Sequence, residues 1–174
     1  MRRGRILGVA ALLSMAAGGS MVWAQANDDG TFAGALWGEL AGLRLVGDDA
    51  VGAVPYAREG QAHGETLVTL QSTVTIDGVT GVVLVKRSYG EAATRDGIIA
   101  HPNDNLENIT VMFQREAGYD PANGDWFWAM YAPDGMVGAM EGMTMAGRVG
   151  MCSGCHAAAP GGDYIFLHDG LPAR

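Results

Sequence analysis

Two cysteines and a histidine near the C-terminal end are the residues best suited to chemistry. They stand in the segment Cys152-Ser153-Gly154-Cys155-His156, which holds the only two cysteines of the 174-residue chain. Two thiols at this spacing can each add across a vinyl group of one porphyrin, and the histidine that follows can bind the iron. The spacing therefore predicts one covalently attached haem c, with His156 as metal ligand. A structural disulfide or a redox-active Cys-x-x-Cys pair is the alternative interpretation.

The N-terminal segment has the features of a secretion signal. Three arginines, Arg2, Arg3 and Arg5, precede an apolar stretch over residues 6–17, and Ala24-Gln25-Ala26 offers a small-x-small cleavage site. The stretch is too short to span a bilayer, although an uncleaved anchor stays the alternative. Haem is attached to such motifs outside the cytoplasm, so the two signals support each other. We expect a signal peptide at 1–26, one domain at 27–174, a periplasmic location and no membrane insertion after cleavage.

The charge balance restricts the partners that the protein can bind. The formal net charge is −8, and loss of the three N-terminal arginines would take it to −11. So acidic a surface argues against nucleic acid or an anionic membrane as partner. It would suit a soluble, basic redox carrier.

Hydrophobic periodicity predicts one helix followed by a β-rich region. Large apolar residues recur at helical spacing over 31–45, which predicts an amphipathic helix capped by Asp29 or Thr31. The strands are expected at 66–70, 73–76, 82–89, 108–114 and 125–131, with a short one at 164–167. Turns are expected at 77–78 and 120–124. The haem motif is expected on a helical turn between Gly147 and Pro160. The predicted fold class is α+β, a mainly antiparallel sheet with a few helices and a C-terminal c-type haem attachment motif.

Residues around the iron are harder to assign. Small electron-transfer cytochromes c usually place an axial methionine after the attachment motif, but no methionine follows His156. The candidate core or pocket methionines all precede it: Met112, Met130, Met136, Met140, Met143, Met145 and Met151. We expect the five from 136 to 151 to pack against the macrocycle. A sixth ligand from one of these, or from His63, His101 or His168, stays open, and the expected state is an open sixth position.

Lys86 is the only lysine in the chain and lies inside the apolar strand over 82–89. Alternation puts it on the same face as Leu84, opposite Val85 and Arg87. If it points inward, burial would lower its pKa and favour the neutral, nucleophilic amine. The alternative is a lysine that protects an edge strand from aggregation. On the strand at 125–131, Trp126, Trp128 and Met130 share one face, with Phe127 and Tyr131 on the other.

Several segments together resemble the cytochrome P-460 family. They are the strand over 81–88, the block GYDPANGDWFW at 118–128, and CSGCH at 152–156 followed by DYIF at 163–166. The resemblance covers most of residues 80–169. It implies a β-rich homodimer with one c-type haem per subunit. In members that oxidise hydroxylamine it also implies a lysine bonded to the porphyrin, for which the matching residue is Lys86. The related cytochromes c′-beta share the fold without that bond and bind nitric oxide at the iron.

The sequence departs from the enzyme pattern in one respect. Hydroxylamine-oxidising members place a carboxylate just before the haem motif, but residues 142–151 contain no acid. Glu141 is the nearest carboxylate and Arg148 the only charged residue between them, so these two are the weak candidates for moving protons. We expect an exported haem protein that oxidises hydroxylamine or a related small nitrogen compound. The alternatives are a nitric oxide-binding protein without turnover and an electron-transfer cytochrome.

Overall fold

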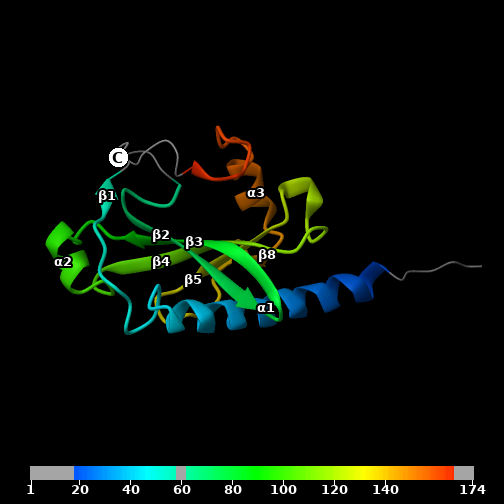
Figure 1. The fold of residues 1–174 in the computed structure, drawn as a ribbon, viewed down its shortest axis with the longest axis horizontal. Helices are drawn as coiled ribbons and strands as arrows, with labels where there is room; N and C mark the ends of the chain where they lie inside the picture. Colours follow the sequence, from blue (N-terminus) through cyan, green and yellow to red (C-terminus); the bar gives the residue numbers. More distant parts are fainter. Residues whose placement is uncertain (1–17, 58–61, 167–174) are drawn as a thin grey trace, which may run out of the picture.

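A six-stranded antiparallel sheet forms the centre of the molecule, with helices on both sides (Figure 1). The computed structural model describes residues 18–57 and 62–166. Its helices are α1 (Gly18–Gly42), α2 (Arg95–Ala100) and α3 (Gly150–His156), with a 3₁₀ turn at Pro121–Asn123. Its strands are β1 (Tyr56–Ala57), β2 (Thr66–Ile76), β3 (Val79–Tyr89), β4 (Leu106–Gln114), β5 (Trp126–Tyr131), β6 (Ala139–Met140), β7 (Met143–Thr144) and β8 (Ala146–Gly147). The predicted α+β class is confirmed.

The sheet is built from neighbouring hairpins, in the order β1-β2-β3-β4-β5-β8, and β6 and β7 form a separate two-stranded ribbon. Asp77 and Gly78 both adopt left-handed backbone conformations, φ 51° and 82°, as the tight turn between β2 and β3 requires. The predicted segments 66–70 and 73–76 are one continuous strand. The β4–β5 hairpin closes through 120–124, as predicted, with Gly124 left-handed.

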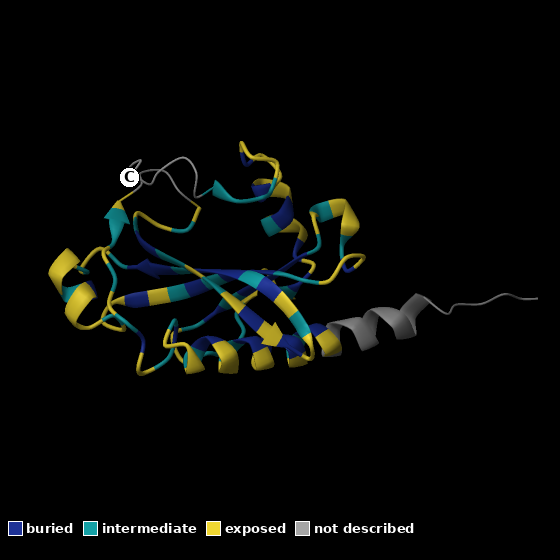
Figure 2. Cartoon of the chain, viewed as in Figure 1, coloured by how far each residue is buried: buried dark blue, intermediate teal, exposed yellow. Residues whose placement is uncertain are grey.

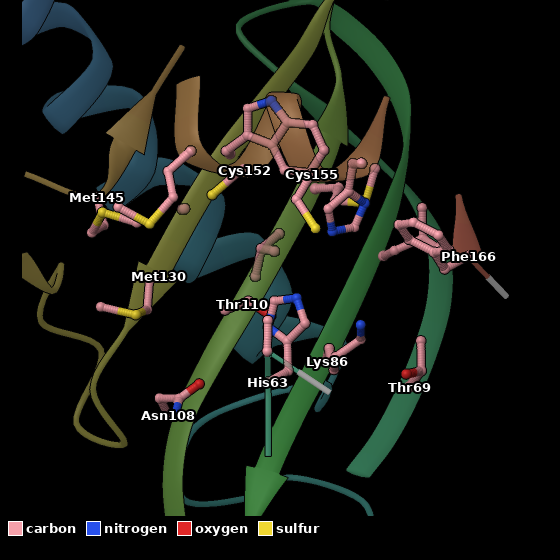
Figure 3. A pocket seen from close by; sticks show the side chains of 18 of the residues that line it. His63, Thr69, Lys86, Asn108, Thr110, Met130, Met145, Cys152, Cys155 and Phe166 are labelled. Carbon is pink, nitrogen blue, oxygen red and sulfur yellow. The ribbon is translucent and has the colours of Figure 1, made fainter. Parts of the chain in front are cut away.

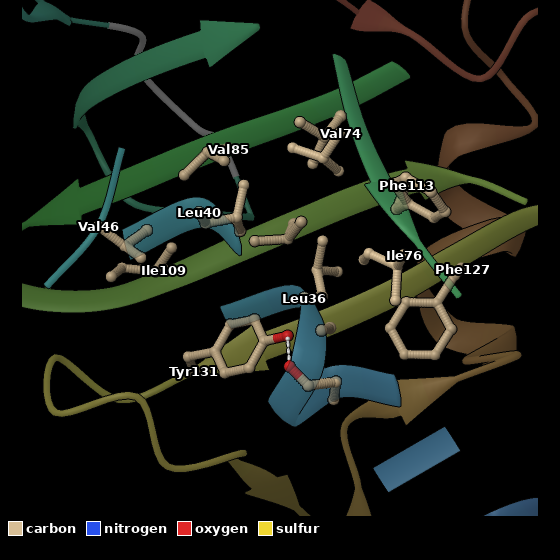
Figure 4. Packing of buried hydrophobic residues seen from close by; sticks show 14 of the residues in the cluster. Leu36, Leu40, Val46, Val74, Ile76, Val85, Ile109, Phe113, Phe127 and Tyr131 are labelled. Carbon is tan, nitrogen blue, oxygen red and sulfur yellow. Dashed lines mark hydrogen bonds between the residues drawn. The ribbon is translucent and has the colours of Figure 1, made fainter. Parts of the chain in front are cut away.

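Helix α1 covers one face of the sheet (Figure 1). Phe32, Leu36 and Leu40 are buried against the strands, as the periodicity predicts. Figure 4 shows Leu36 and Leu40 among the buried side chains of the strands. The predicted ends of the helix were wrong. Asp29 lies within α1, where its carboxylate accepts a hydrogen bond from the Tyr119 hydroxyl at 3.0 Å, and α1 ends at Gly42, so Leu43 lies beyond it and is 45% exposed. The helix therefore begins before the residues predicted to cap it and ends three residues earlier than the predicted residue 45.

The two faces of the sheet carry separate apolar clusters. Figure 2 shows buried residues along the central strands and on the side of α1 that faces them. On the α1 side, Val83 and Val85 of β3 pack with Phe127 of β5. The fully buried Arg87 shares that face and donates a hydrogen bond to the Val51 carbonyl at 2.7 Å. On the α3 side, Leu84 packs with aromatic residues of β5. Strand alternation thus separates a core that holds the fold from a face that is available to a ligand.

Helix α3 carries the CSGCH segment on the face of the sheet opposite α1 (Figure 1). The helical turn expected between Gly147 and Pro160 is confirmed. The strand expected at 164–167 was wrong for residues 164–166, which pair with no strand, and Leu167 lies outside the described residues. Tyr164 has a left-handed φ of 67°, which breaks an extended backbone and turns its carbonyl toward α3.

The predicted signal peptide is largely outside the structure, because residues 1–17 are not among those described. Across the described ranges, no helix has the length and apolarity needed to cross a membrane.

Candidate haem-binding site

A cavity of about 260 Å³ lies between the α3-side face of the sheet and α3 itself (Figure 3). Strands β2 to β5 supply its floor through Thr69, Leu84, Thr110 and Trp128. Helix α3 and the segment after it supply the opposite wall, including Phe166. Segments from both halves of the chain therefore meet around one cavity. Cys152, Cys155 and His156 of the predicted attachment motif all line it.

His156 is held in the orientation that a metal ligand needs. It is 8% exposed, and its Nδ1 donates a hydrogen bond to the Tyr164 carbonyl at 2.7 Å. That bond fixes the tautomer and leaves Nε2 as the nitrogen with a free lone pair. Burial, and next the charge of Lys86, lower the pKa of His156, although the bond to Tyr164 opposes them. The neutral imidazole is the form that binds iron.

Cys152 and Cys155 both line the cavity from α3. Residues three apart lie on the same face of a helix, so one turn presents both sulfurs to one ligand. The thiols are not joined in a disulfide. Burial, followed by the neighbouring Cys155, raises the pKa of Cys152 to about 11. Burial therefore keeps Cys152 as a thiol, in the same cavity as His156.

Lys86 lies in the middle of the sheet and on the cavity face. Its strand, β3, has neighbours on both sides, with Thr69 of β2 and Thr110 of β4 directly opposite Lys86. The edge-strand explanation for this lysine is therefore wrong. The side chain is half-buried and lines the cavity together with both cysteines (Figure 3). The structure brings the one lysine and the CSGCH segment to a single site.

His63 is the second histidine of the cavity. Its ring centre lies 6.1 Å from that of His156, with the ring planes at 74°. A hydrogen bond joins its Nδ1 to Thr110 Oγ1 at 3.4 Å. Burial, then the charges of Lys86 and His156, lower the pKa of His63 to about 4, so it is neutral at neutral pH. Of the other candidates for a sixth ligand, His101 is exposed at the end of α2 and His168 lies outside the described residues.

The methionines divide into two groups. Five line the cavity: Met112, Met130, Met140, Met145 and Met151. Met136 and Met143 are 69% and 48% exposed and do not line it, which departs from the prediction for the segment 136–151.

The two weak proton-transfer candidates are not part of the cavity. Glu141 is exposed at the turn of the β6–β7 ribbon. Arg148 lies over the Tyr119 ring, 4.7 Å from its centre. Among the described residues that line the cavity, none is an aspartate or a glutamate.

Sequence reasoning missed the polar residues of the cavity, Tyr56, Thr69, Asn108 and Thr110, and it also missed Phe166. Their only signal was alternation along each strand, and the pairing register that places Thr69 and Thr110 beside Lys86 cannot be read from one strand alone.

The cavity fits a haem on its own features. It is lined by apolar and thioether side chains, one wall carries two thiols and a histidine with its Nε2 free, and the opposite wall carries an orphaned donor. That donor is the indole Nε1 of Trp128, which is buried without a hydrogen-bond partner. The Trp128 ring lies 4.8 Å from that of His156. Such a donor set on an antiparallel sheet defines a haem-binding α+β protein.

Comparison with known families agrees with this class. The model of the family described as Cytochrome P460 matches residues 66–167, more than half of the chain. The chain therefore belongs to the cytochrome P-460 family, and membership implies a haem cofactor. No curated protein and no solved structure matches it.

Proposed function

We propose that this protein is an exported, periplasmic c-type cytochrome that oxidises hydroxylamine or a related small nitrogen compound and passes the electrons to a soluble redox carrier. The observation that carries this proposal is the meeting of Lys86 with Cys152, Cys155 and His156 in one cavity. The family membership supports it, because the family includes hydroxylamine-oxidising haem proteins. A homodimeric assembly is part of the same proposal.

The attachment of haem follows from the two thiols. Each thiol adds its sulfur and its hydrogen across one vinyl double bond, so a carbon–sulfur bond forms and no electrons are lost or gained. His156, anchored on the Tyr164 carbonyl, would hold the iron through Nε2. Because the three residues share one short helix, the covalent bonds fix the position of the metal ligand as well.

Lys86 is placed to form a third covalent bond. Its strand partners Thr69 and Thr110 flank it, and its side chain enters the cavity from the centre of the sheet. A neutral amine held against the edge of a porphyrin can add its nitrogen to a meso carbon while its proton moves to the macrocycle, with no net loss of electrons. Holding the amine in place lowers the entropic cost of that addition.

Haem iron, when bound, supplies an electron acceptor and a Lewis acid for a small nitrogen compound on the side opposite His156. The residues that would surround such a compound on the sheet are Thr110, Asn108 and Tyr56, which offer hydroxyl and amide groups. Electrons removed from the compound leave to a soluble one-electron carrier, and its protons leave to water.

A specific observation favours a second function, capture of nitric oxide without turnover. The described lining contains no carboxylate, while oxidation of hydroxylamine releases protons that a carboxylate would accept. Binding of nitric oxide releases none. This alternative keeps the haem and His156 and omits the Lys86 bond.

Replacement of Lys86 by arginine tests the choice between the two functions. A bond that saturates a meso carbon interrupts conjugation, so the native holoprotein should absorb at longer wavelength than an ordinary c-type cytochrome. Lys86→Arg should abolish that shift and the hydroxylamine oxidation while both thioethers remain. Arg95→Met, which alters an exposed cation on α2, is the control and should change neither.

Peptide mapping by mass spectrometry completes the test. An ordinary spectrum and an unmodified Lys86 peptide in the native protein would rule out the enzyme and leave nitric oxide binding. Haem that extracts freely into acidified organic solvent would refute covalent attachment and both functions with it.

A further inference from the structure

His63 lies near His156 in the same cavity, and the proposed function gives His63 no role. It comes from the segment just before β2, far in sequence from α3, and Figure 3 shows it beside Lys86 and Thr110. The ring centres of His63 and His156 are 6.1 Å apart, with the planes nearly perpendicular. Two imidazoles from distant parts of the chain thus approach one another inside the space that fits the haem.

The hydrogen bonds engage the same nitrogen, Nδ1, on both rings. His156 donates its Nδ1 hydrogen to the Tyr164 carbonyl, and the Nδ1 of His63 is bonded to Thr110 Oγ1. In the tautomer in which the Nδ1 of His63 donates to Thr110, both Nε2 atoms carry lone pairs. Histidine ligands of metals typically show this arrangement, in which a partner at one nitrogen orients the other toward the metal.

The separation of the rings matches two ligands of one metal ion. A histidine nitrogen lies about 2 Å from the metal it binds and its ring centre roughly 1 Å further, so two opposed imidazoles have centres about 6 Å apart. The observed 6.1 Å agrees with this value. A substrate molecule between the iron and His63 would add further bond lengths, and the rings would have to lie farther apart.

We propose that His63 binds the sixth coordination position of the haem iron in the resting protein, and that small nitrogen ligands bind by displacing it. This inference rests on the proposed haem site and refines it, because the side opposite His156 becomes available only when His63 leaves. It applies equally to a hydroxylamine-oxidising enzyme and to a nitric oxide-binding protein.

The two histidines differ in how firmly they are held, which identifies the one that moves. His156 sits on a helix, is bonded at 2.7 Å and is covalently adjacent to Cys155. His63 lies outside helix and strand, its bond to Thr110 is 3.4 Å long, and the next residue is Gly64 with a φ of +91°. A residue in such a loop can swing away at lower cost than one fixed in a helix.

Spin state measures this ligand directly, without any assay of turnover. The ferric holoprotein should be low-spin by optical and electron paramagnetic resonance spectra. His63→Ala should make it high-spin, and free imidazole added to that variant should restore the low-spin spectrum by filling the space. The control His101→Ala removes an exposed histidine at the end of α2 and should leave the spectrum unchanged.

Ligand binding gives an independent measurement. If His63 occupies the iron in more than about nine-tenths of the molecules, the apparent nitric oxide affinity of the ferrous protein should rise at least about tenfold in His63→Ala. His63→Phe keeps an aromatic ring without a ligating nitrogen, so it decides the question if the alanine variant fails to fold.

The possible outcomes distinguish failure of His63 ligation from failure of the proposed function. A high-spin native protein, or a low-spin spectrum that persists in both His63 variants, would overturn the ligation by His63 while leaving the covalent haem intact. Haem that is not attached at Cys152 and Cys155, or a native spectrum insensitive to loss of His156, would overturn the proposed function itself.

Discussion

Phe127 and Trp128 are neighbours on β5 that point to opposite faces of the sheet, and truncating each tests whether the two faces have separate roles. The Phe127 side chain is fully buried on the α1 side, with its ring centre 4.8 Å from that of Phe32 and 6.3 Å from that of Tyr119. Trp128 lies on the cavity side, 4.8 Å from His156. Phe127→Ala should therefore damage stability alone, whereas Trp128→Ala should also change the haem environment.

The expected loss for Phe127→Ala follows from its contacts. Truncation of a buried phenylalanine costs about 3–5 kcal/mol, and tilted ring pairs contribute roughly 0.5–1.5 kcal/mol each beyond simple burial. Because Phe127 loses two such pairs, we expect about 4 kcal/mol. In a chain of this size that corresponds to a fall in melting temperature of roughly 8–16 °C.

Urea unfolding followed by far-ultraviolet circular dichroism measures the loss, and the absorption spectrum of the folded holoprotein measures the haem environment. Leu43→Ala, at a position 45% exposed, is the control and should change stability by no more than about 0.5 kcal/mol. The separation of the two faces would be refuted by a loss under about 1.5 kcal/mol in Phe127→Ala. The separation would also be refuted if Phe127→Ala shifted the main absorption band as much as Trp128→Ala does.

Two further predictions concern buried polar groups on the α1 side. Tyr131→Phe removes a hydroxyl that donates a hydrogen bond to the Ala33 carbonyl at 2.8 Å. Urea unfolding should therefore show a free energy of unfolding lower by about 1 kcal/mol. An unchanged unfolding midpoint would contradict the bond. Burial, the largest cause, raises the pKa of Asp29, so the folded protein holds that proton more tightly than the unfolded chain. The resulting stability is fully present below the ordinary aspartate pKa of about 4 and is lost as the pH rises through the raised value. The free energy of unfolding of Asp29→Asn, which cannot titrate, should therefore increase relative to the native protein over that window, and a constant difference would count against the raised pKa.

The sequence by itself determined the local elements and the chemistry of the attachment motif. Alternating β-branched residues over 66–89, divided by Asp77-Gly78, determine a hairpin through strand periodicity and turn geometry. The spacing of Cys152, Cys155 and His156 determines their common face on one helical turn in the same local way. The resemblance to the cytochrome P-460 family likewise rested on short segments, and the family comparison confirmed it.

Only the tertiary structure decided which residues meet across the chain. Alternation left the inward face of Lys86 open, since both faces of β3 are apolar, and the pairing with β2 and β4 placed it at the centre of the sheet. Position along the chain gave no reason to prefer His63 over His101, yet folding brought one to the cavity and left the other in solvent. Periodicity and spacing act between residues a few positions apart, whereas register and burial depend on contacts between segments that are distant in sequence.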